Sequence, residues 1–273
     1  AAVQVPFERG GAEVLVEGLR RQLVARGHNV DVVSLPFKWY PPERLLSSCL
    51  QWRMLDLSEA NGRPIDLVMA TKFPSYAVKH PNKVTWLVHQ YRQAYDWYGT
   101  PLSDFSPAPE STRLRQSVIE LDQRTLAESR RLYAISRNVA DRLQRFNGLH
   151  ANVLYPPTLH EGLLHASGYG DTIACVSRLD AAKRVDLLIR AMRHVPQPVR
   201  CVIAGTGPDR DRLEKLIASL HLTDRVRLLG WVDDDTLIRL YAECFAVFYA
   251  PLDEDYGYAT VEAFQASKPV VTA

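Results

Sequence analysis

The second half of the chain alternates short apolar runs with amphipathic segments, and this pattern restricts the fold more than any other sequence feature. The segments between the runs place hydrophobic residues three and four positions apart, as a helix with one buried face does. Strands that are apolar throughout belong to a parallel sheet covered by helices on both faces. The predicted strands are Thr172–Ser177, Val199–Ala204, Val226–Leu229, Phe245–Tyr249 and Pro269–Thr272.

The first half shows the same alternation less regularly. It opens with the apolar stretch Ala1–Phe7, and a helix is predicted over Ala12–Arg26 because leucines recur there every four residues. Gly27 then suits the end of a helix, and Val30–Leu35 is predicted to be a strand. Further strands are predicted at Ile65–Ala70, Val84–His89 and Leu132–Ser136, and further helices at Ser111–Ser129 and Asn138–Arg145.

A pair of prolines separates the two halves. Pro156 and Pro157 follow Tyr155 and cannot continue a helix or fill a central strand. We therefore predict two domains, 1–157 and 158–273. The predicted fold class is α/β, with two Rossmann-like domains.

Charge and cysteine content exclude some classes of protein. The net charge is +2, with 20 Lys and Arg against 15 Asp and Glu in residues 1–157 and 13 against 16 in residues 158–273. Nucleic acid is not an expected partner; the basic first half could favour an acidic membrane or a phosphorylated substrate, or be an ordinary solvated surface. The four cysteines form no CxxC pair, which favours a reducing compartment. No run reaches the ~18 apolar residues of a membrane span.

Two glycine-containing loops follow predicted strands. Gly10 and Gly11 precede the first helix, where glycines let a ligand approach the backbone and the helix start favours anions; a tight turn would use them equally well. Gly205 and Gly207 follow the second strand of the second domain without the third glycine of a dinucleotide fingerprint. They indicate either close approach to a nucleotide or a plain turn.

Arg178 and Lys183 follow the first strand of the second domain. Both leave the carboxyl edge of the sheet, where open α/β sheets bind ligands. A guanidinium grips phosphate oxygens bidentately and an ammonium adds a point charge, so the pair would suit a diphosphate. Two solvated surface residues are the alternative.

An acidic loop follows the fourth strand and runs into a helix. Glu254 lies in this loop and Glu262 in the helix, and carboxylates accept hydrogen bonds from paired sugar hydroxyls. Backbone amides around Gly257 and the positive helix end suit phosphate. The loop could thus bind both parts of a sugar nucleotide, although acidic loops are common.

The remaining polar residues have simpler interpretations than a substrate-binding loop. His89 ends a predicted strand of the first domain and either faces a binding cleft or is an ordinary strand-end histidine. Asp233, Asp234 and Asp235 precede a helix, so we expect them to cap it rather than bind a metal. No other spacing supports a metal site.

Taken together, these features resemble the retaining nucleotide-sugar glycosyltransferases of the GT-B fold, of the glycosyltransferase family 4 type (glycosyl transferases group 1). The resemblance covers nearly all of the second half and only parts of the first. Four ordered segments carry it: Gly10–Glu13, Val176–Lys183, Val202–Pro208, and Glu254–Glu262 with the following Ala263-Phe264 and Lys268–Val271.

The resemblance implies roles for individual residues. Arg178 and Lys183 would hold the donor diphosphate, Glu262 the ribose hydroxyls, and Glu254 the transferred sugar. Asp255 stands where these proteins often have glycine. The remaining implied contacts are His89 at the donor sugar, Gly10 and Gly11 near phosphate and acceptor, Asp255, Tyr256, Gly257 and Tyr258 at the sugar, and Gly205, Gly207, Gly230, Trp231 and Val232 at the base.

The resemblance also implies an activity: transfer of a sugar from a UDP- or GDP-sugar, without metal or cofactor, to a glycan, lipid-linked or small-molecule acceptor. Polysaccharide or glycolipid synthesis in the cytoplasm, with peripheral contact at the inner membrane face, would be the setting. A sugar-nucleotide-binding module without turnover and a nucleotide-sugar epimerase are the alternatives.

Two segments bear on these expectations. Such proteins normally continue beyond Ala273 with another strand and closing helices, so the C-terminal domain is expected to be truncated. Pro36–Leu57 mixes basic and aromatic residues and could contact a membrane or a lipid-linked acceptor; a packed helix with one exposed face is the alternative.

Overall fold

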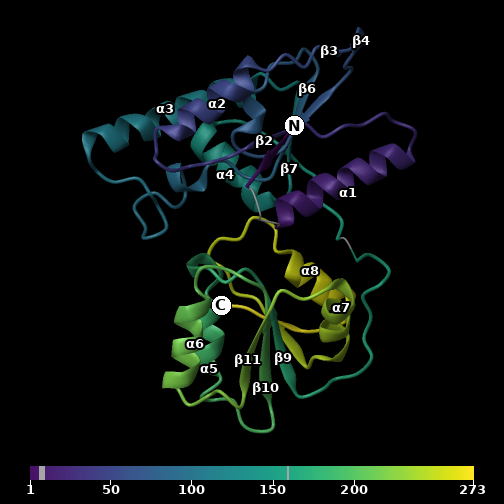
Figure 1. Cartoon of the computed structure of the whole chain (residues 1–273), viewed down its shortest axis with the longest axis vertical. Coiled ribbons are helices and arrows are strands. Elements are labelled where there is room, and N and C mark those ends of the chain that lie inside the picture. The colour runs from purple at the N-terminus through teal and green to yellow at the C-terminus, as the bar shows by residue number, and fades with distance from the viewer. Residues whose placement is uncertain (6–9, 159) are drawn as a thin grey trace. The chain divides into compact units, whose positions relative to one another are not determined.

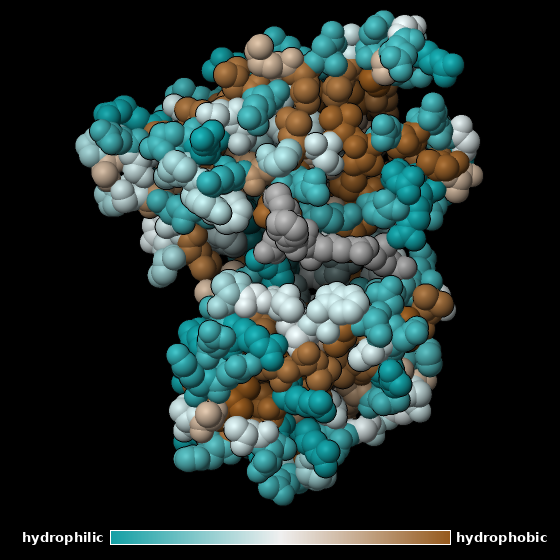
Figure 2. Space-filling model, in the orientation of Figure 1, coloured by the Kyte–Doolittle hydropathy of each residue, from teal (hydrophilic) through white to brown (hydrophobic). Residues whose placement is uncertain are grey.

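The computed structural model describes residues 1–5, 10–158 and 160–273, shown as a ribbon in Figure 1. The chain forms two compact units, unit 1 (Ala1–Pro157) and unit 2 (Thr158–Ala273). Each is an α/β unit built on parallel strands. Hydrophobic and hydrophilic residues are interspersed on the face of each unit that Figure 2 shows.

Unit 1 contains two groups of parallel strands. One pairs β1 (Ala2–Gln4) with β2 (Ser34–Pro36). The Ala1 amino group donates a hydrogen bond to the Met69 carbonyl at 2.6 Å, so β1 lies beside β5 of the second group. That second group has the order β5 (Val68–Ala70), β6 (Lys83–Leu87), β7 (Arg131–Ala134) and β8 (Asn152–Val153).

The helices of unit 1 have recognisable ends. In α4, Ser136 caps the start by accepting a hydrogen bond from the Val139 amide, and Gly148 ends the helix in the left-handed conformation. The helix α2 (Arg44–Met54) buries Leu45, Cys49 and Trp52. The helical elements are α1 (Gly11–Ala25), α2 (Arg44–Met54), α3 (Pro109–Ala127), α4 (Arg137–Asn147) and the short η1 (Ser75–Ala77) and η2 (Arg92–Ala94).

Unit 2 is a single parallel sheet of five strands. Along the chain the strands take positions 3-2-1-4-5, which places the first and fourth side by side and reverses the direction of winding between them. This switch point fixes where ligand-binding loops meet. The sheet order is β11 (Val226–Gly230), β10 (Arg200–Ala204), β9 (Thr172–Val176), β12 (Ala246–Phe248) and β13 (Val270–Val271).

Two apolar layers cover the sheet of unit 2. Ala174 belongs to the cluster with Tyr241 and Ala263, whereas its neighbour Cys175 belongs to the cluster with Ile189 and others on the opposite face. Consecutive strand residues therefore point into different cores, as the uninterrupted apolar runs predict. Figure 1 shows α5 (Val185–Ala191) and α6 (Arg210–Ser219) on one face, and α7 (Asp234–Glu243) and α8 (Tyr258–Gln265) on the other.

The strands predicted for unit 1 differ from the observed ones. The strand expected at Val30–Leu35 is displaced to Ser34–Pro36, because only these residues pair with β1. The last two residues of the expected Ala1–Phe7 strand lie outside the described residues. A short hairpin of β3 (Glu59–Ala60) and β4 (Arg63–Pro64) was not predicted.

Candidate functional site

The loops that follow β9 and β12 meet at the switch point of the unit 2 sheet. These two strands pair in parallel, so their carboxyl ends lie at one edge. Residues 177–183 leave β9 there, and residues 249–257 leave β12. Open α/β sheets bind ligands in this position, which makes the edge the candidate site.

Lys183 and Glu254 form an ion pair across this edge. The Tyr249 hydroxyl donates a hydrogen bond to Glu254 Oε2 at 3.0 Å and lies 3.4 Å from Lys183 Nζ. Burial and the Glu254 carboxylate both raise the pKa of Tyr249, so the phenol stays protonated and donates. Three side chains from two loops are thus joined before any ligand is bound.

Arg178 lies in the same loop as Lys183. Its guanidinium Nε is 3.6 Å from Asp180 Oδ2, and the side chain is half exposed. The Asp180 carboxylate in turn accepts a hydrogen bond from the Lys183 amide at 3.2 Å and starts the short helix η3 (Ala181–Lys183). Asp180 therefore shapes the loop that carries both cations.

The loop after β12 leads directly into α8. Gly257 precedes this helix with a φ of +79°, and a Cβ there would lie 3.2 Å from the Tyr249 ring. Glycine is therefore favoured by both conformation and space. Asp255 and Tyr256 are partly buried, and the Tyr256 and Tyr258 rings meet edge to face at 5.0 Å.

Glu262 lies within the first two turns of α8 and is only 9% exposed. The Tyr241 hydroxyl donates a hydrogen bond to its Oε2 at 2.9 Å. Burial raises the pKa of Glu262, while Tyr241 and the nearby His160 act in the opposite direction. The structure thus places Glu262 deeper than Glu254, with one carboxylate oxygen already engaged.

The glycines after β10 have a packing reason. Gly205 has a φ of +139°, and a Cβ there would lie 1.8 Å from the Ser177 carbonyl oxygen; at Gly207 it would lie 2.3 Å from the Leu179 carbonyl oxygen. The two loops are also joined by the hydrogen bond from the Leu179 amide to Thr206, at 2.9 Å. The close packing of the neighbouring loop, which carries Arg178, therefore requires glycine at both positions.

The loop after β11 presents an exposed aromatic ring. Trp231 is 79% exposed, and it follows Gly230, whose φ is +77°. Val232 next to it is partly buried. Asp233 then caps α7 by accepting a hydrogen bond from the Thr236 amide at 2.8 Å, which confirms the predicted capping role.

In unit 1 the predicted residues lie at the start of α1 and just after β6. Gly10 is the N-cap of α1 and Gly11 its first residue. The Gly10 amide donates to Glu13 at 2.9 Å, and Glu13 also pairs with Lys72, the second residue after β5, at 2.8 Å. His89 follows β6, with its Nδ1 2.7 Å from the Gln90 carbonyl oxygen.

Sequence reasoning missed two residues of unit 2, Tyr249 and His160. Tyr249 directly follows a strand whose carboxyl end carries the site, so its position was a usable signal. His160 lies 3.7 Å from Glu262 and 3.3 Å from Asp234, but a single histidine in a loop gives no sequence signal.

The described residues offer neither a metal cluster nor a membrane span. Among residues 1–5, 10–158 and 160–273, no group of three or more His, Cys, Asp or Glu side chains could hold a metal ion. None of the helices in the described part of the chain is long and apolar enough to cross a membrane.

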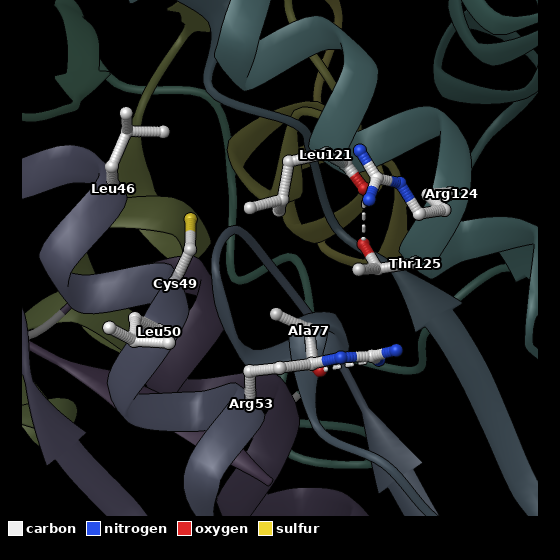
Figure 3. A pocket seen from close by; sticks show the side chains of 8 residues that line it. All are labelled: Leu46, Cys49, Leu50, Arg53, Ala77, Leu121, Arg124 and Thr125. Atoms are coloured by element: carbon white, nitrogen blue, oxygen red, sulfur yellow. Dashed lines mark hydrogen bonds between the residues drawn. The ribbon is translucent and has the colours of Figure 1, made fainter.

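A small apolar cavity lies between α2 and α3 in unit 1. Figure 3 shows Leu46, Cys49 and Leu50 lining it from α2, facing Leu121 and Thr125 of α3. The cavity has a volume of about 190 Å³. Its remaining lining residues are Arg53, Ala77 and Arg124.

Solved structures share this fold. The chain superimposes on sucrose-phosphate synthase of Thermosynechococcus elongatus with a TM-score of 0.73 at 16% identity, and on HepE of Anabaena, in complex with UDP and glucose, with a TM-score of 0.68 at 18% identity. Each likeness covers 99% of this chain and 79% of the other. The predicted class, α/β with two Rossmann-like domains of the GT-B type, is confirmed.

Residues 167–273 match the profile of the family described as Glycosyl transferases group 1. An uncharacterized glycosyltransferase of Methanocaldococcus jannaschii is 38% identical over 103 residues, which are 37% of this chain and 26% of that protein. The Campylobacter jejuni N-acetylgalactosamine-N,N'-diacetylbacillosaminyl-diphospho-undecaprenol 4-alpha-N-acetylgalactosaminyltransferase is 34% identical over 99 residues, or 36% and 27%. The matched segment spans about a quarter of the length of these relatives.

Proposed function

We propose that the protein is a retaining glycosyltransferase of the family 4 type that uses a nucleotide-sugar donor. One observation carries the proposal: Lys183 and Glu254, from the loops after the first and fourth strands, meet at the switch point of unit 2. Both residues fall inside the segment that matches the glycosyltransferase family. A cation and a carboxylate at this edge suit the phosphates and hydroxyls of one ligand.

The donor diphosphate would bind between the β9 loop and the start of α8. Arg178 and Lys183 supply positive charge from the loop. The first amides of α8 follow Gly257 and have no side-chain cap in the described structure, so they suit phosphate oxygens. Binding there would draw Lys183 toward phosphate and free Glu254 for the sugar hydroxyls.

The nucleoside would lie deeper along the same edge. Glu262 would accept hydrogen bonds from the ribose hydroxyls through its Oε1, because Oε2 is engaged by Tyr241. The exposed Trp231 ring, with Gly230 and Val232, would stack on the base. UDP- and GDP-sugars both fit this description.

Transfer would then break the bond between the anomeric carbon and the diphosphate. Charge develops on the leaving diphosphate, and Arg178, Lys183 and the α8 amides stabilise it. The acceptor oxygen bonds to the anomeric carbon on the face that the diphosphate leaves. The acceptor proton passes to a phosphate oxygen of the leaving group, which keeps protons and charge balanced.

Unit 1 would bind the acceptor, near Gly10, Gly11 and His89. A lipid-linked acceptor is supported by the name of the Campylobacter relative, which includes diphospho-undecaprenol. It is also supported by α2, where Leu50 is 58% and Met54 76% exposed on a helix that begins with Arg44. Peripheral contact with the cytoplasmic membrane face follows from this proposal.

A donor screen tests the proposal. Isothermal titration with UDP, GDP and their sugars, in EDTA, should detect binding, and Lys183→Met should weaken it about tenfold or more through loss of a charge-assisted contact. Lys215→Met, in an exposed position of α6, is the matched control. Unchanged affinity in Lys183→Met contradicts the assignment.

Product analysis then separates the possible activities. Donor-dependent glycosylation of lipid-linked or soluble glycans, with the anomeric configuration kept, supports the proposal. Binding without turnover indicates a binding module, and a changed sugar nucleotide without acceptor indicates an epimerase. Sedimentation with anionic vesicles tests the membrane contact. The double variant Leu50→Glu, Met54→Glu should no longer sediment with the vesicles. A wild-type protein that does not sediment contradicts the proposed membrane contact.

A further inference from the structure

The first residues of unit 2 pack against α8, the helix that carries Glu262. The Thr158 hydroxyl donates a hydrogen bond to Gln265 Oε1 at 2.7 Å. Thr158 and His160 are both buried, with His160 only 7% exposed. Residues from the start and the end of unit 2 therefore form one buried contact.

His160 lies between two carboxylates in this contact. Its Nδ1 is 3.7 Å from Glu262 Oε1, and its Nε2 is 3.3 Å from Asp234 Oδ1. Neither ring nitrogen makes a hydrogen bond to another described residue. Each nitrogen of this buried ring therefore faces a carboxylate oxygen.

Several polar groups surround Glu262. The titratable groups that face it are Tyr241 and Asp234 from α7, His160 from the opening segment, and Tyr258 from its own helix. Burial and the Asp234 carboxylate raise the pKa of Glu262, whereas His160 and the Tyr241 hydrogen bond lower it. His160 is the basic side chain among these groups, and Asp234 is largely exposed, so its charge is more strongly screened.

We propose that His160 is a positioning residue of the nucleotide site, whose buried ring faces Glu262 and keeps this carboxylate ionised and oriented for the ribose hydroxyls. The inference rests on the proposed function of Glu262. An ionised carboxylate accepts hydrogen bonds about twice as strongly as a neutral acceptor, so the charge state of Glu262 sets the nucleotide affinity. His160 acts through Glu262 and does not itself contact the ligand.

The pair predicts a specific pH dependence. His160 lowers the pKa of Glu262, so removal of this side chain should allow Glu262 to be protonated at higher pH. At alkaline pH Glu262 is ionised with or without His160. The loss of affinity in a His160 variant should therefore be large at pH 6 and small at pH 9, whereas a merely structural defect would persist at both.

The experiment measures UDP and GDP affinity by calorimetry for His160→Gln across this pH range. We expect weaker binding at pH 6 and near wild-type binding at pH 9, because only at the lower pH does the loss of His160 allow Glu262 to be protonated. His165→Gln, an exposed histidine of the same segment, is the matched control and should bind as wild type. In a Glu262→Gln background, His160→Gln should add no further loss.

A second measurement does not need nucleotide. The His160 ring is titrated by NMR in the wild-type protein, with its signals assigned through His160→Gln. A ring titration that changes when Glu262→Gln is introduced supports the pair, and one that does not change overturns it. An equal loss of affinity at pH 6 and 9, or full additivity with Glu262→Gln, also overturns the proposal. If the wild-type protein binds neither nucleotide, the proposed function fails and the ring titration alone decides the pairing.

Discussion

Gly205 and Gly10 were predicted to serve ligands in the same way, and the structure separates them. In Gly205→Ala the new Cβ would lie 1.8 Å from the Ser177 carbonyl oxygen, whereas real Cβ contacts stay above 3.0 Å. The loops after β9 and β10 would have to separate by about 1.2 Å or more. Gly10→Ala meets nothing closer than Glu13 at 3.5 Å, and its φ of −142° suits any residue.

The cost of Gly205→Ala follows from the hydrogen bonds that it breaks. Separation of the loops disrupts two backbone hydrogen bonds between them, from Ser177 to Ala204 at 3.0 Å and from Leu179 to Thr206 at 2.9 Å. At about 1 kcal/mol for each bond, and about 1–2 kcal/mol for alanine at a φ of +139°, unit 2 should lose about 3–4 kcal/mol of unfolding free energy. Gly10→Ala should cost less than about 1 kcal/mol.

Hydrogen exchange read by mass spectrometry distinguishes these outcomes, because peptides of each unit report their own opening free energy. Amides of β10 should exchange at least about a hundredfold faster in Gly205→Ala, since about 1.4 kcal/mol corresponds to a factor of ten. Unit 1 peptides and the Gly10→Ala protein should behave as wild type. Wild-type protection of β10 in Gly205→Ala would refute the packing explanation for this glycine.

Two further predictions concern buried polar groups. Burial raises the pKa of Asp122 to about 7, although the Tyr95 hydroxyl donates a hydrogen bond to it at 2.7 Å. The folded state therefore binds the Asp122 proton more tightly than the unfolded chain does. Unit 1 should accordingly lose stability as the pH rises from about 4 to about 7. Asp122→Asn should abolish that slope in exchange measurements on unit 1 peptides, and an unchanged slope would contradict the assignment. Tyr249→Phe removes the hydroxyl between Glu254 and Lys183 and should lower the transfer rate roughly tenfold with little loss of stability. A wild-type rate for that variant would show that Tyr249 does not position the pair.

The sequence predicted unit 2 well because its strands are buried on both faces. Apart from the exposed Arg200, the residues of β9 and β10 are buried or partly buried, so the apolar runs end within a residue or two of the strands. In unit 1 the strands are short and their ends are set by pairing. Val30–Leu35 has strand-forming residues, yet only its last two residues pair with β1.

The turn of the unpredicted hairpin in unit 1 carries a sequence signal of its own. Asn61 and Gly62 both have positive φ, 53° and 73°, and join β3 to β4. An Asn-Gly pair favours this kind of turn, but the flanking strand residues are exposed, so no alternating apolar pattern marks the strands. The Asn-Gly pair alone, without an alternating apolar pattern in the flanking residues, was therefore not enough to predict the hairpin.

The site was predictable in part for a related reason. Loop residues at strand ends can be placed from topology, which is how Lys183 and Glu254 were singled out. Contacts that depend on tertiary packing cannot be read in this way. The burial of Glu262 beneath Tyr241 and its neighbour His160 follow from how α7, α8 and the opening segment pack, and these are distant in sequence.

The order of strands in unit 2 also has a consequence during synthesis. Lys183 and Glu254 are 71 residues apart, and they meet only when β12 inserts beside β9. A ribosome-bound chain that has released β9, β10 and β11 holds the basic loop without its acidic partner. Ligand recognition should therefore emerge abruptly, once the fourth strand clears the exit tunnel.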